Sequence, residues 1–179
     1  DSLMSPSSIY GITKQTQEQY ILTIAKALQI QSVILRFQNV YGPGEVLGAG
    51  KWRVTYATVW RNVVPTFIFK SVSKEPLPLE NGGVATRDFI YVDDICSGLI
   101  LCALKGEPGE VYNLASGIET PIKKLAETIN KLTGNKTGIM MLPKRPWDSS
   151  GKRFASTSKS ERILGFKAKV DIDTGLKKT

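Results

Sequence analysis

Apolar and polar residues alternate along this chain with two periods, one typical of helices and one typical of strands. An amphipathic pattern predicts a helix over 8–30, with Ser7 or Ser8 as its cap. The β-branched run at 32–37 predicts a buried strand, and the glycines and proline at 41–45 predict a loop. The chain therefore opens with a helix, a strand and a break.

The same alternation continues to the end of the chain. Further helices are predicted over 57–72 with an interruption near Pro65, from a cap at Asp93-Asp94 to about 105, over 121–132 before Gly134, and over 157–164 before Gly165. Further strands are predicted at 77–79 on a sheet edge because of Pro78, and at 88–92, 111–115 and 140–142. Alternating helices and strands predict an α/β fold.

Composition excludes several kinds of chemistry. The 179 residues fit one domain or one domain plus part of another, and 41% apolar and 22% charged residues argue against wholesale disorder. There is no histidine, which excludes Ser-His-Asp and Cys-His nucleophiles and any His-ligated metal. Chemistry must use Tyr, Lys, Ser, Thr, carboxylates or a cofactor, and no metal site is predicted.

The cysteines and the apolar runs bear on location. Cys96 and Cys102 lie six residues apart on one predicted helix, so they face different sides and are interpreted as two buried thiols that do not pair. Without a disulfide framework they fit a reducing, cytoplasmic compartment. The longest apolar run, 95–104, is too short to span a bilayer, and residues 1–6 lack a signal-peptide pattern. No membrane association is expected.

Charge predicts an anionic partner. There are 24 Lys and Arg against 16 Asp and Glu, a net charge of +8 that is concentrated late in the chain. Nucleic acid and phosphorylated small molecules are both candidates, and a solvated basic surface without a partner is the third possibility. The chain has no helix-turn-helix, zinc-finger or aromatic-rich basic strand pattern, which disfavours nucleic acid.

The strongest local feature is a tyrosine-lysine pair near the start. Tyr10 and Lys14 are four residues apart at the beginning of the predicted helix, so their side chains lie on one face, one turn apart. An ammonium group at this distance favours the phenolate form of tyrosine, which makes it a usable acid or base near neutrality. Such a pair also occurs by chance as an exposed helical pair, so its context decides between the two interpretations.

The context is an ordered series of further motifs. They are Leu35-Arg36-Phe37-Gln38-Asn39-Val40-Tyr41-Gly42-Pro43, Thr86-Arg87-Asp88-Phe89-Ile90-Tyr91-Val92-Asp93-Asp94, Tyr112-Asn113-Leu114-Ala115-Ser116-Gly117 and Arg145-Pro146-Trp147-Asp148. In this order the series resembles the extended short-chain dehydrogenase/reductase family, specifically its NAD-dependent nucleotide-sugar epimerases and dehydratases, such as UDP-glucose 4-epimerase. The resemblance runs from Tyr10 to Leu164-Gly165-Phe166.

The resemblance implies roles for residues of the first half. Tyr10 matches the catalytic tyrosine that moves the proton of a sugar hydroxyl while NAD takes a hydride. Lys14 matches the lysine that hydrogen-bonds the nicotinamide ribose and tunes the tyrosine. Phe37 lies in the segment whose backbone runs near the nicotinamide, so Tyr10, Lys14 and Phe37 form the implied cofactor site. Asn39 matches an asparagine that contacts the substrate's diphosphate, the alternative being a loop residue that caps its own backbone.

It also implies a substrate site. Asn62 falls where the family places a helix N-terminus against the nucleotide, which suits phosphate. Arg87 and Arg145 match arginines that grip the diphosphate or nucleotide, and Asp148 matches the carboxylate that accepts from the ribose hydroxyls. The alternative for either arginine is a surface ion pair. A nucleoside-diphosphate ligand would account for part of the positive charge.

Two departures from the family pattern concern its first half. The family opens with a strand, a glycine-rich turn and a helix that hold the NAD pyrophosphate, and no Gly-x-Gly-x-x-Gly is present here. Only nine residues precede Tyr10, so the family's catalytic Ser or Thr has no counterpart. The chain is therefore expected to be the C-terminal portion of such an enzyme. By itself it should expose apolar strand edges and be poorly soluble.

The implied fold is a partial Rossmann-like sheet with a smaller α/β substrate-binding domain. Residues 1–45 and 86–115 are assigned to the NAD-binding domain, and 46–85 and 116–179 to the substrate domain. Within the latter, Trp52, Tyr56 and Trp60 are spaced four apart, which fits core packing or a lid, with substrate contact as the alternative.

The function implied is an NAD-dependent epimerase of a nucleoside-diphosphate sugar, most simply a UDP-sugar, in carbohydrate biosynthesis. A dehydratase or decarboxylase of the same family is the first alternative, and a non-catalytic sugar-nucleotide-binding scaffold is the second. NADP is an alternative to NAD. The full-length form is expected to be a homodimer, because many family members pair through the helix that carries the tyrosine. Ile21, Leu22, Ala25 and Leu28 would permit this, and they would equally pack against the sheet.

Overall fold

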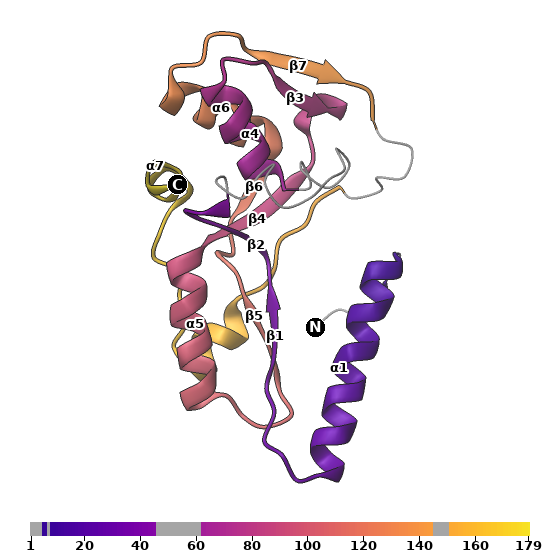
Figure 1. The fold of residues 1–179 in the computed structure, drawn as a ribbon. Helices are drawn as coiled ribbons and strands as arrows, with labels where there is room; N and C mark the ends of the chain where they lie inside the picture. Colours follow the sequence, from indigo (N-terminus) through magenta and orange to yellow (C-terminus); the bar gives the residue numbers. More distant parts are fainter. Residues whose placement is uncertain (1–4, 7, 46–61, 145–150) are drawn as a thin grey trace.

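The computed structural model describes residues 5–6, 8–45, 62–144 and 151–179 (Figure 1). The described helices are α1 (Ile9–Ala27), α4 (Val63–Val72), α5 (Val92–Lys105), α6 (Ile122–Thr133) and α7 (Ile172–Lys178). The described strands are β1 (Ile34–Phe37), β2 (Asn39–Tyr41), β3 (Leu77–Glu80), β4 (Thr86–Tyr91), β5 (Val111–Leu114), β6 (Glu119–Pro121) and β7 (Ile139–Leu142). This is the predicted α/β architecture.

Parallel pairing dominates the strand topology. β1 pairs with β5 from Ile34 opposite Val111, and β2 pairs with β4 through Asn39 opposite Phe89. β6 lies antiparallel on the other edge of β4, and β3 and β7 form a separate parallel pair. Parallel strands need crossover connections, which the intervening helices supply.

Two apolar clusters meet at β4. Phe89 and Tyr91 face the cluster that β2, β3, α4, α6 and α7 share, whereas Ile90 faces the cluster of α5 and β5. Successive strand residues point to opposite faces, so a strand buried on both faces becomes a continuous apolar run. This is why the sequence around Phe89 shows no polar alternation.

Helix α1 stands apart from the rest of the molecule (Figure 1). It begins with Ser8, whose hydroxyl oxygen accepts from the backbone N–H of Gly11 at 3.1 Å, as the sequence predicts. Only Ala25 of this helix is buried, and Tyr20, Ile21 and Leu28 are exposed. An amphipathic helix with an uncovered apolar face has room for further protein against it.

Most predicted elements are confirmed, with four differences. Pro65 lies in the first turn of α4, where its missing N–H costs nothing, so it does not interrupt a helix. Tyr91, not Asp93-Asp94, occupies the cap position of α5, and the Asp94 carboxylate instead accepts from the backbone N–H groups of Lys169 and Val170.

The third difference concerns thiols. Cys102 is buried as predicted, and burial raises its pKa, but Cys96 is exposed. Both are free, as expected.

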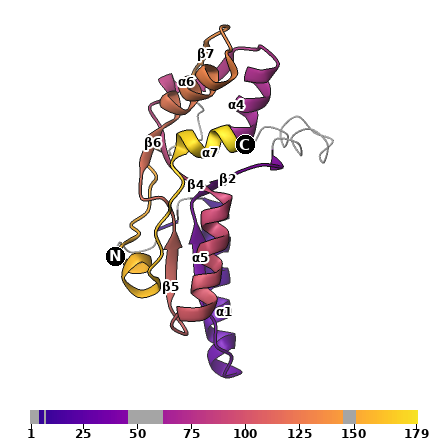
Figure 2. The same ribbon diagram turned by 90° about the vertical axis from the view of Figure 1, so that its left-hand side faces the viewer.

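The fourth difference is that β2, β6 and α7 are not among the predicted elements, because each is too short to show a period. Figure 2 shows α7 lying beside α6 and β4, where Leu176 joins the core.

Within the described ranges, no helix combines the length and the apolar character needed to cross a bilayer. The contacts between the helices and strands do not decide the predicted division into two domains, which stays a prediction.

Candidate active site

The structure brings Tyr10 and Lys14 together on α1. Lys14 Nζ lies 5.6 Å from the centroid of the Tyr10 ring, and it donates to Gln17 Oε1 at 3.2 Å. The Tyr10 side chain is 72% exposed, so its hydroxyl can reach a bound molecule. Both of these contacts lie within α1. Because Tyr10 and Lys14 are four residues apart, the phenol and the ammonium lie on the same side of the helix.

A charged pair connects α1 to the sheet. Arg36 on β1 donates from Nε to Glu18 Oε1 at 2.8 Å and from Nη2 to Glu18 Oε2 at 2.5 Å. The hydrogen bond to Glu18 raises the pKa of Arg36 above its usual value. Because the bidentate pair is directional, it sets the orientation of the helix that carries Tyr10 relative to β1. Sequence reasoning did not single out this pair, because neither the helix pattern nor the strand pattern shows which of their side chains meet.

Phe37 and Asn39 lie where β1 passes into β2. Phe37 ends β1 and its side chain is 47% exposed, and Asn39 begins β2 with an exposed side chain. Gln38 between them donates its backbone N–H to Leu114 at 3.3 Å. The carboxyl end of a parallel strand is the usual place for ligands in such sheets. Both residues are therefore placed at the accessible end of the sheet.

Arg87 shares a sheet face with Asn39. Asn39 is the register partner of Phe89, and Arg87 lies two residues before Phe89, so the three side chains point to the same side. Arg87 Nη1 donates to the carbonyl oxygens of Thr86 at 2.7 Å and Gly151 at 3.2 Å. The guanidinium thus reaches across to the backbone of residue 151.

Asn62 lies at the start of α4. It occupies the cap position without a side-chain cap bond, and its Nδ2 donates to Glu45 Oε1. Thr66 donates its hydroxyl to the Asn62 carbonyl at 2.7 Å. Asn62 therefore connects the first turn of α4 to Glu45. Arg145, Asp148, Trp52, Tyr56 and Trp60 lie outside the described residues.

Sequence reasoning missed one buried carboxylate beside Arg87. Asp88 is fully buried and its two oxygens accept from Ser116, Gly117 and Ala155. The available signal was an acidic residue inside an apolar strand, because a buried charge must be paired or hydrogen-bonded.

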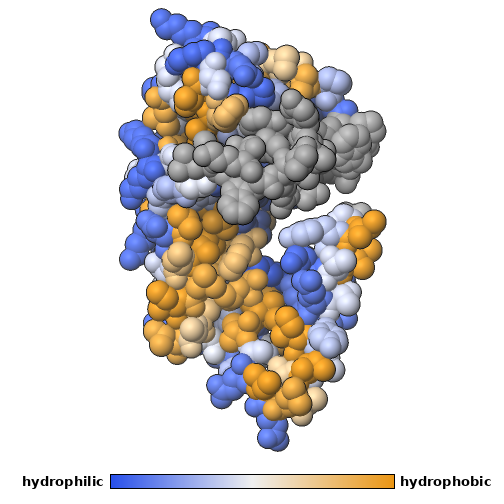
Figure 3. Space-filling model, in the orientation of Figure 1, coloured by the Kyte–Doolittle hydropathy of each residue, from blue (hydrophilic) through white to orange (hydrophobic). Residues whose placement is uncertain are grey.

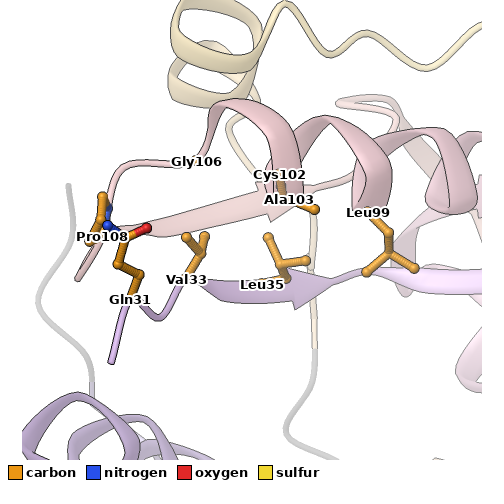
Figure 4. A pocket seen from close by; sticks show the side chains of 8 residues that line it. All are labelled: Gln31, Val33, Leu35, Leu99, Cys102, Ala103, Gly106 and Pro108. Carbon is orange, nitrogen blue, oxygen red and sulfur yellow. The ribbon is translucent and has the colours of Figure 1, made fainter. Parts of the chain in front are cut away.

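A hollow of about 320 Å³ lies elsewhere, between β1 and α5 (Figure 4). Its lining is mostly apolar and includes Val33, Leu35 and Leu99, with Gln31 at one end. Among the described residues that line it, none is charged. It is therefore unsuited to a diphosphate and is not the candidate site. In the described segments, no cluster of Cys, Asp and Glu could hold a metal ion.

Comparison with known proteins identifies the family. The sequence model of the NAD dependent epimerase/dehydratase family matches residues 1–115. The chain belongs to this family. The resemblance that the motifs indicated is thereby confirmed, and so is the α/β fold class.

Solved enzyme structures superpose on nearly the whole chain. The enzyme WbmF of Bordetella bronchiseptica, solved with NAD+ and UDP, is 60% identical and has a TM-score of 0.85 over 100% of this chain and 53% of its own. UDP-glucose 4-epimerase of Thermotoga maritima, solved with UDP-glucose, is 29% identical with a TM-score of 0.85 over 98% of this chain and 53% of its own.

A curated relative has a different activity. The dTDP-4-dehydro-6-deoxyglucose reductase of Escherichia coli is 29% identical over 180 residues, which is 99% of this chain and 53% of the relative. This chain spans a quarter to about half the length of the curated relatives it matches. Family enzymes of similar sequence thus share the fold while their substrates and reactions differ.

Proposed function

We propose that the complete protein is an NAD-dependent epimerase that acts on a nucleoside-diphosphate sugar, with a UDP-sugar as the favoured substrate. The observation that carries the proposal is the placement of Tyr10 and Lys14, an exposed phenol with an ammonium 5.6 Å from its ring. A scaffold that only binds its ligand has no use for this pair, because binding alone needs no proton transfer. The pair therefore favours an enzyme over a scaffold.

The proposed acid-base chemistry uses Tyr10. Its phenolate takes the proton of a sugar hydroxyl and returns it later. Bound NAD would supply the reversible hydride acceptor for the sugar carbon that carries this hydroxyl. Lys14 would hold the nicotinamide ribose, and Phe37 would border the nicotinamide.

The residues present fit one end of the cofactor. The Lys14 ammonium is exposed beside Tyr10, and Phe37 is half-exposed at the carboxyl end of a parallel strand, where dinucleotides bind in such sheets. The glycine-rich turn for the pyrophosphate is not among these 179 residues. NAD is favoured over NADP by the NAD+ and NADH complexes of WbmF.

For the substrate we propose Asn39, Asn62, Arg87, Arg145 and Asp148 as the binding residues. Arg87 and Asn39 share one sheet face, which allows both to contact one diphosphate. A planar guanidinium binds phosphate oxygens through two N–H donors. UDP is favoured because WbmF, 60% identical to this chain, was solved with UDP.

Assembly, domain division and location complete the proposal. Residues 1–45 and 86–115 would form part of the NAD-binding domain, and 46–85 and 116–179 the substrate domain. A homodimer would pair exposed α1 residues such as Ile21 and Leu28, although Ala25 is already buried within the chain. We place the protein in the cytoplasm, in carbohydrate biosynthesis.

The test is a thermal-shift series on the complete protein with NAD present. UDP and UDP-glucose should each raise the Tm, because a ligand that binds only the folded state stabilises it. A DNA duplex is the control for charge alone. Any shift in Tm that it causes at low salt should disappear at physiological salt. A protein whose Tm responds to DNA but to no nucleoside diphosphate would contradict the proposal.

Product analysis then separates the reaction types. An epimerase interconverts UDP-glucose and its C4 epimer without net oxidation, whereas a dehydratase releases water and leaves a keto sugar. Nuclear magnetic resonance of the product mixture distinguishes the two. A dehydrated product would favour the alternative reaction of the same family.

A further inference from the structure

The buried carboxylate of Asp88 connects three separate segments of the chain. Its Oδ1 accepts from the backbone N–H of Ser116 at 2.9 Å and from the Ser116 hydroxyl at 2.6 Å. Its Oδ2 accepts from the backbone N–H of Gly117 at 3.0 Å and of Ala155 at 3.5 Å. Strand β4, the turn after β5 and the segment around Ala155 are thereby held by one side chain.

The arrangement matters because Arg87 is the next residue. Neighbours on a strand point to opposite faces, so Asp88 faces the turn after β5 while Arg87 faces the opposite side, toward Asn39. The guanidinium of Arg87 is positioned by the carbonyl oxygens of Thr86 and Gly151.

The position of Gly151 depends on the same segment that Asp88 holds. The Gly151 carbonyl also accepts from the backbone N–H of Thr86 at 3.3 Å, and the N–H of Arg153 donates to Thr86 at 3.3 Å. Two residues later, the N–H of Ala155 donates to Asp88. Residues 151–155 therefore run along the start of β4, attached at one end near Arg87 and at the other by the Asp88 carboxylate.

We propose that Asp88 is a positioning residue for nucleotide binding, which holds Arg87 in place through the segment 151–155. The inference rests on the proposed function, because it requires that Arg87 contacts the diphosphate. Asp88 itself, fully buried on the other face of β4, touches no ligand. Its loss would let Gly151 move away from the guanidinium, which would then bind phosphate oxygens less well.

The decisive variant is Asp88→Asn in the complete protein. It keeps the side-chain shape but replaces one oxygen by an NH2 group, which faces backbone N–H donors instead of accepting from them. A matched control is Asp94→Asn. Asp94 is also buried and accepts from two backbone N–H groups, those of Lys169 and Val170, but it anchors the segment before α7 and lies away from Arg87.

Both variants should lower the Tm, and only one should weaken nucleotide binding. Asp88→Asn should raise the Kd for UDP and the KM for UDP-glucose about tenfold, the factor expected for one weakened charge-assisted contact, with kcat and the Kd for NAD nearly unchanged. Asp94→Asn should change the Kd for UDP by less than about twofold, because distant sites act independently. Calorimetry and steady-state kinetics give these values.

A milder variant keeps the test usable if Asp88→Asn fails to fold. Ser116→Ala removes one donor to Asp88 and should raise the Kd for UDP in the same direction by about threefold, less than a whole charged contact. Equal effects of Asp88→Asn and Asp94→Asn on UDP binding would overturn the inference alone, as would an unchanged Kd in Ser116→Ala. A wild-type protein that does not bind UDP would overturn the proposed function, and with it this inference.

Discussion

Single residues in this chain act through their immediate neighbours. Tyr10 is a candidate acid-base group because the Lys14 ammonium lies one turn away and because the phenol is exposed. Tyr41 shows the opposite environment. Its hydroxyl is buried without a hydrogen-bond partner in the described part of the chain, and burial, together with nearby acidic residues, raises its pKa far above the usual range. Two tyrosines of one chain thus differ in burial and in the charged groups near them.

The acid-base role of Tyr10 predicts a specific loss. Tyr10→Phe should lower kcat by at least about a hundredfold, the lower range for removal of a general acid-base group, because phenylalanine has no proton to exchange. The Kd for UDP should not change. The measurement is turnover of UDP-glucose by the complete protein, alongside calorimetry with UDP.

Tyr20→Phe is the matched control, since Tyr20 is exposed on the same helix and four residues or more from the pair. It should retain full activity. Near-normal turnover in Tyr10→Phe would refute the assigned role.

At the scale of elements, the position of a helix depends on a few side-chain contacts. Helix α1 has one buried residue, so the Glu18–Arg36 pair carries much of its attachment to β1. Helix α7 is only seven residues long and is capped by Asp171, whose carboxylate accepts from the backbone N–H and hydroxyl of Thr174. These hydrogen bonds lower the pKa of Asp171. Packing of α7 against β4 also holds this short helix in place.

The attachment of α1 can be measured. Glu18→Gln should lower the free energy of unfolding by about 1 kcal/mol, because a partly buried bidentate ion pair becomes a single hydrogen bond from the guanidinium to a neutral amide. Glu127→Gln is the control: Glu127 pairs with Lys123 at 3.9 Å on the exposed face of α6, and its loss should cost less than about 0.5 kcal/mol. Denaturant titration gives both values, and equal costs would show that the Glu18 pair does not hold α1.

The docking of α7 predicts a steric effect. A Cβ at Gly175 would lie 2.0 Å from Tyr41 Oη and 2.7 Å from Cζ, in a place where Tyr41 is 2% exposed. Gly175→Ala should therefore destabilise the fold by about 1–3 kcal/mol, despite the better helix propensity of alanine.

A variant of Tyr41 tests whether a steric clash causes the loss of stability in Gly175→Ala. Tyr41→Phe removes a buried hydroxyl without a described hydrogen-bond partner, so by itself it should cost little. Combined with Gly175→Ala it should recover part of the lost stability. A double variant as unstable as the sum of the two single variants would contradict the steric explanation.

At the scale of the whole molecule, the described surface has a large apolar region (Figure 3). Leu99, Ile100 and Leu104 of α5 are exposed, and the hollow between β1 and α5 opens beside them. Apolar patches of this kind mark surfaces that contact other protein. The curated relatives that this chain matches are about two to four times as long as the chain itself.

We expect the 179-residue chain, expressed by itself, to associate or precipitate. Size-exclusion chromatography with light scattering should show aggregates or higher oligomers, and Leu104→Lys should reduce them by placing a charge in the apolar region. Lys124→Arg on the charged face of α6 is the control and should leave the association unchanged. A folded, stable monomer by circular dichroism and size-exclusion chromatography would contradict the expectation that the apolar region of α5 drives association.

The elements with a strong period were predictable, and the short ones were not. Helix α1, with its Ser8 cap, and helix α6, with its Gly134 stop, carry local signals that act within a few residues. β2, β6 and α7 have three to seven residues, so their formation depends on partners that the chain brings from elsewhere. The site shows the same division: the positions of Tyr10 and Lys14 follow from helix geometry, whereas Asp88 and the Glu18–Arg36 pair required the fold.

The sequence by itself determined the α/β class, the absence of histidine chemistry and the Tyr10–Lys14 pair, because these rest on local periodicity, composition or spacing. It also carried the family, through the resemblance of its ordered motifs to those of known enzymes and the match to the family model. Only the tertiary structure decided that Arg87 shares a face with Asn39, that Asp88 joins three segments and that Cys96 is exposed. The physical reason is range. Helix spacing and capping act over four residues, whereas strand register and the hydrogen bonds of a buried carboxylate join residues that lie far apart in the chain and meet only after folding.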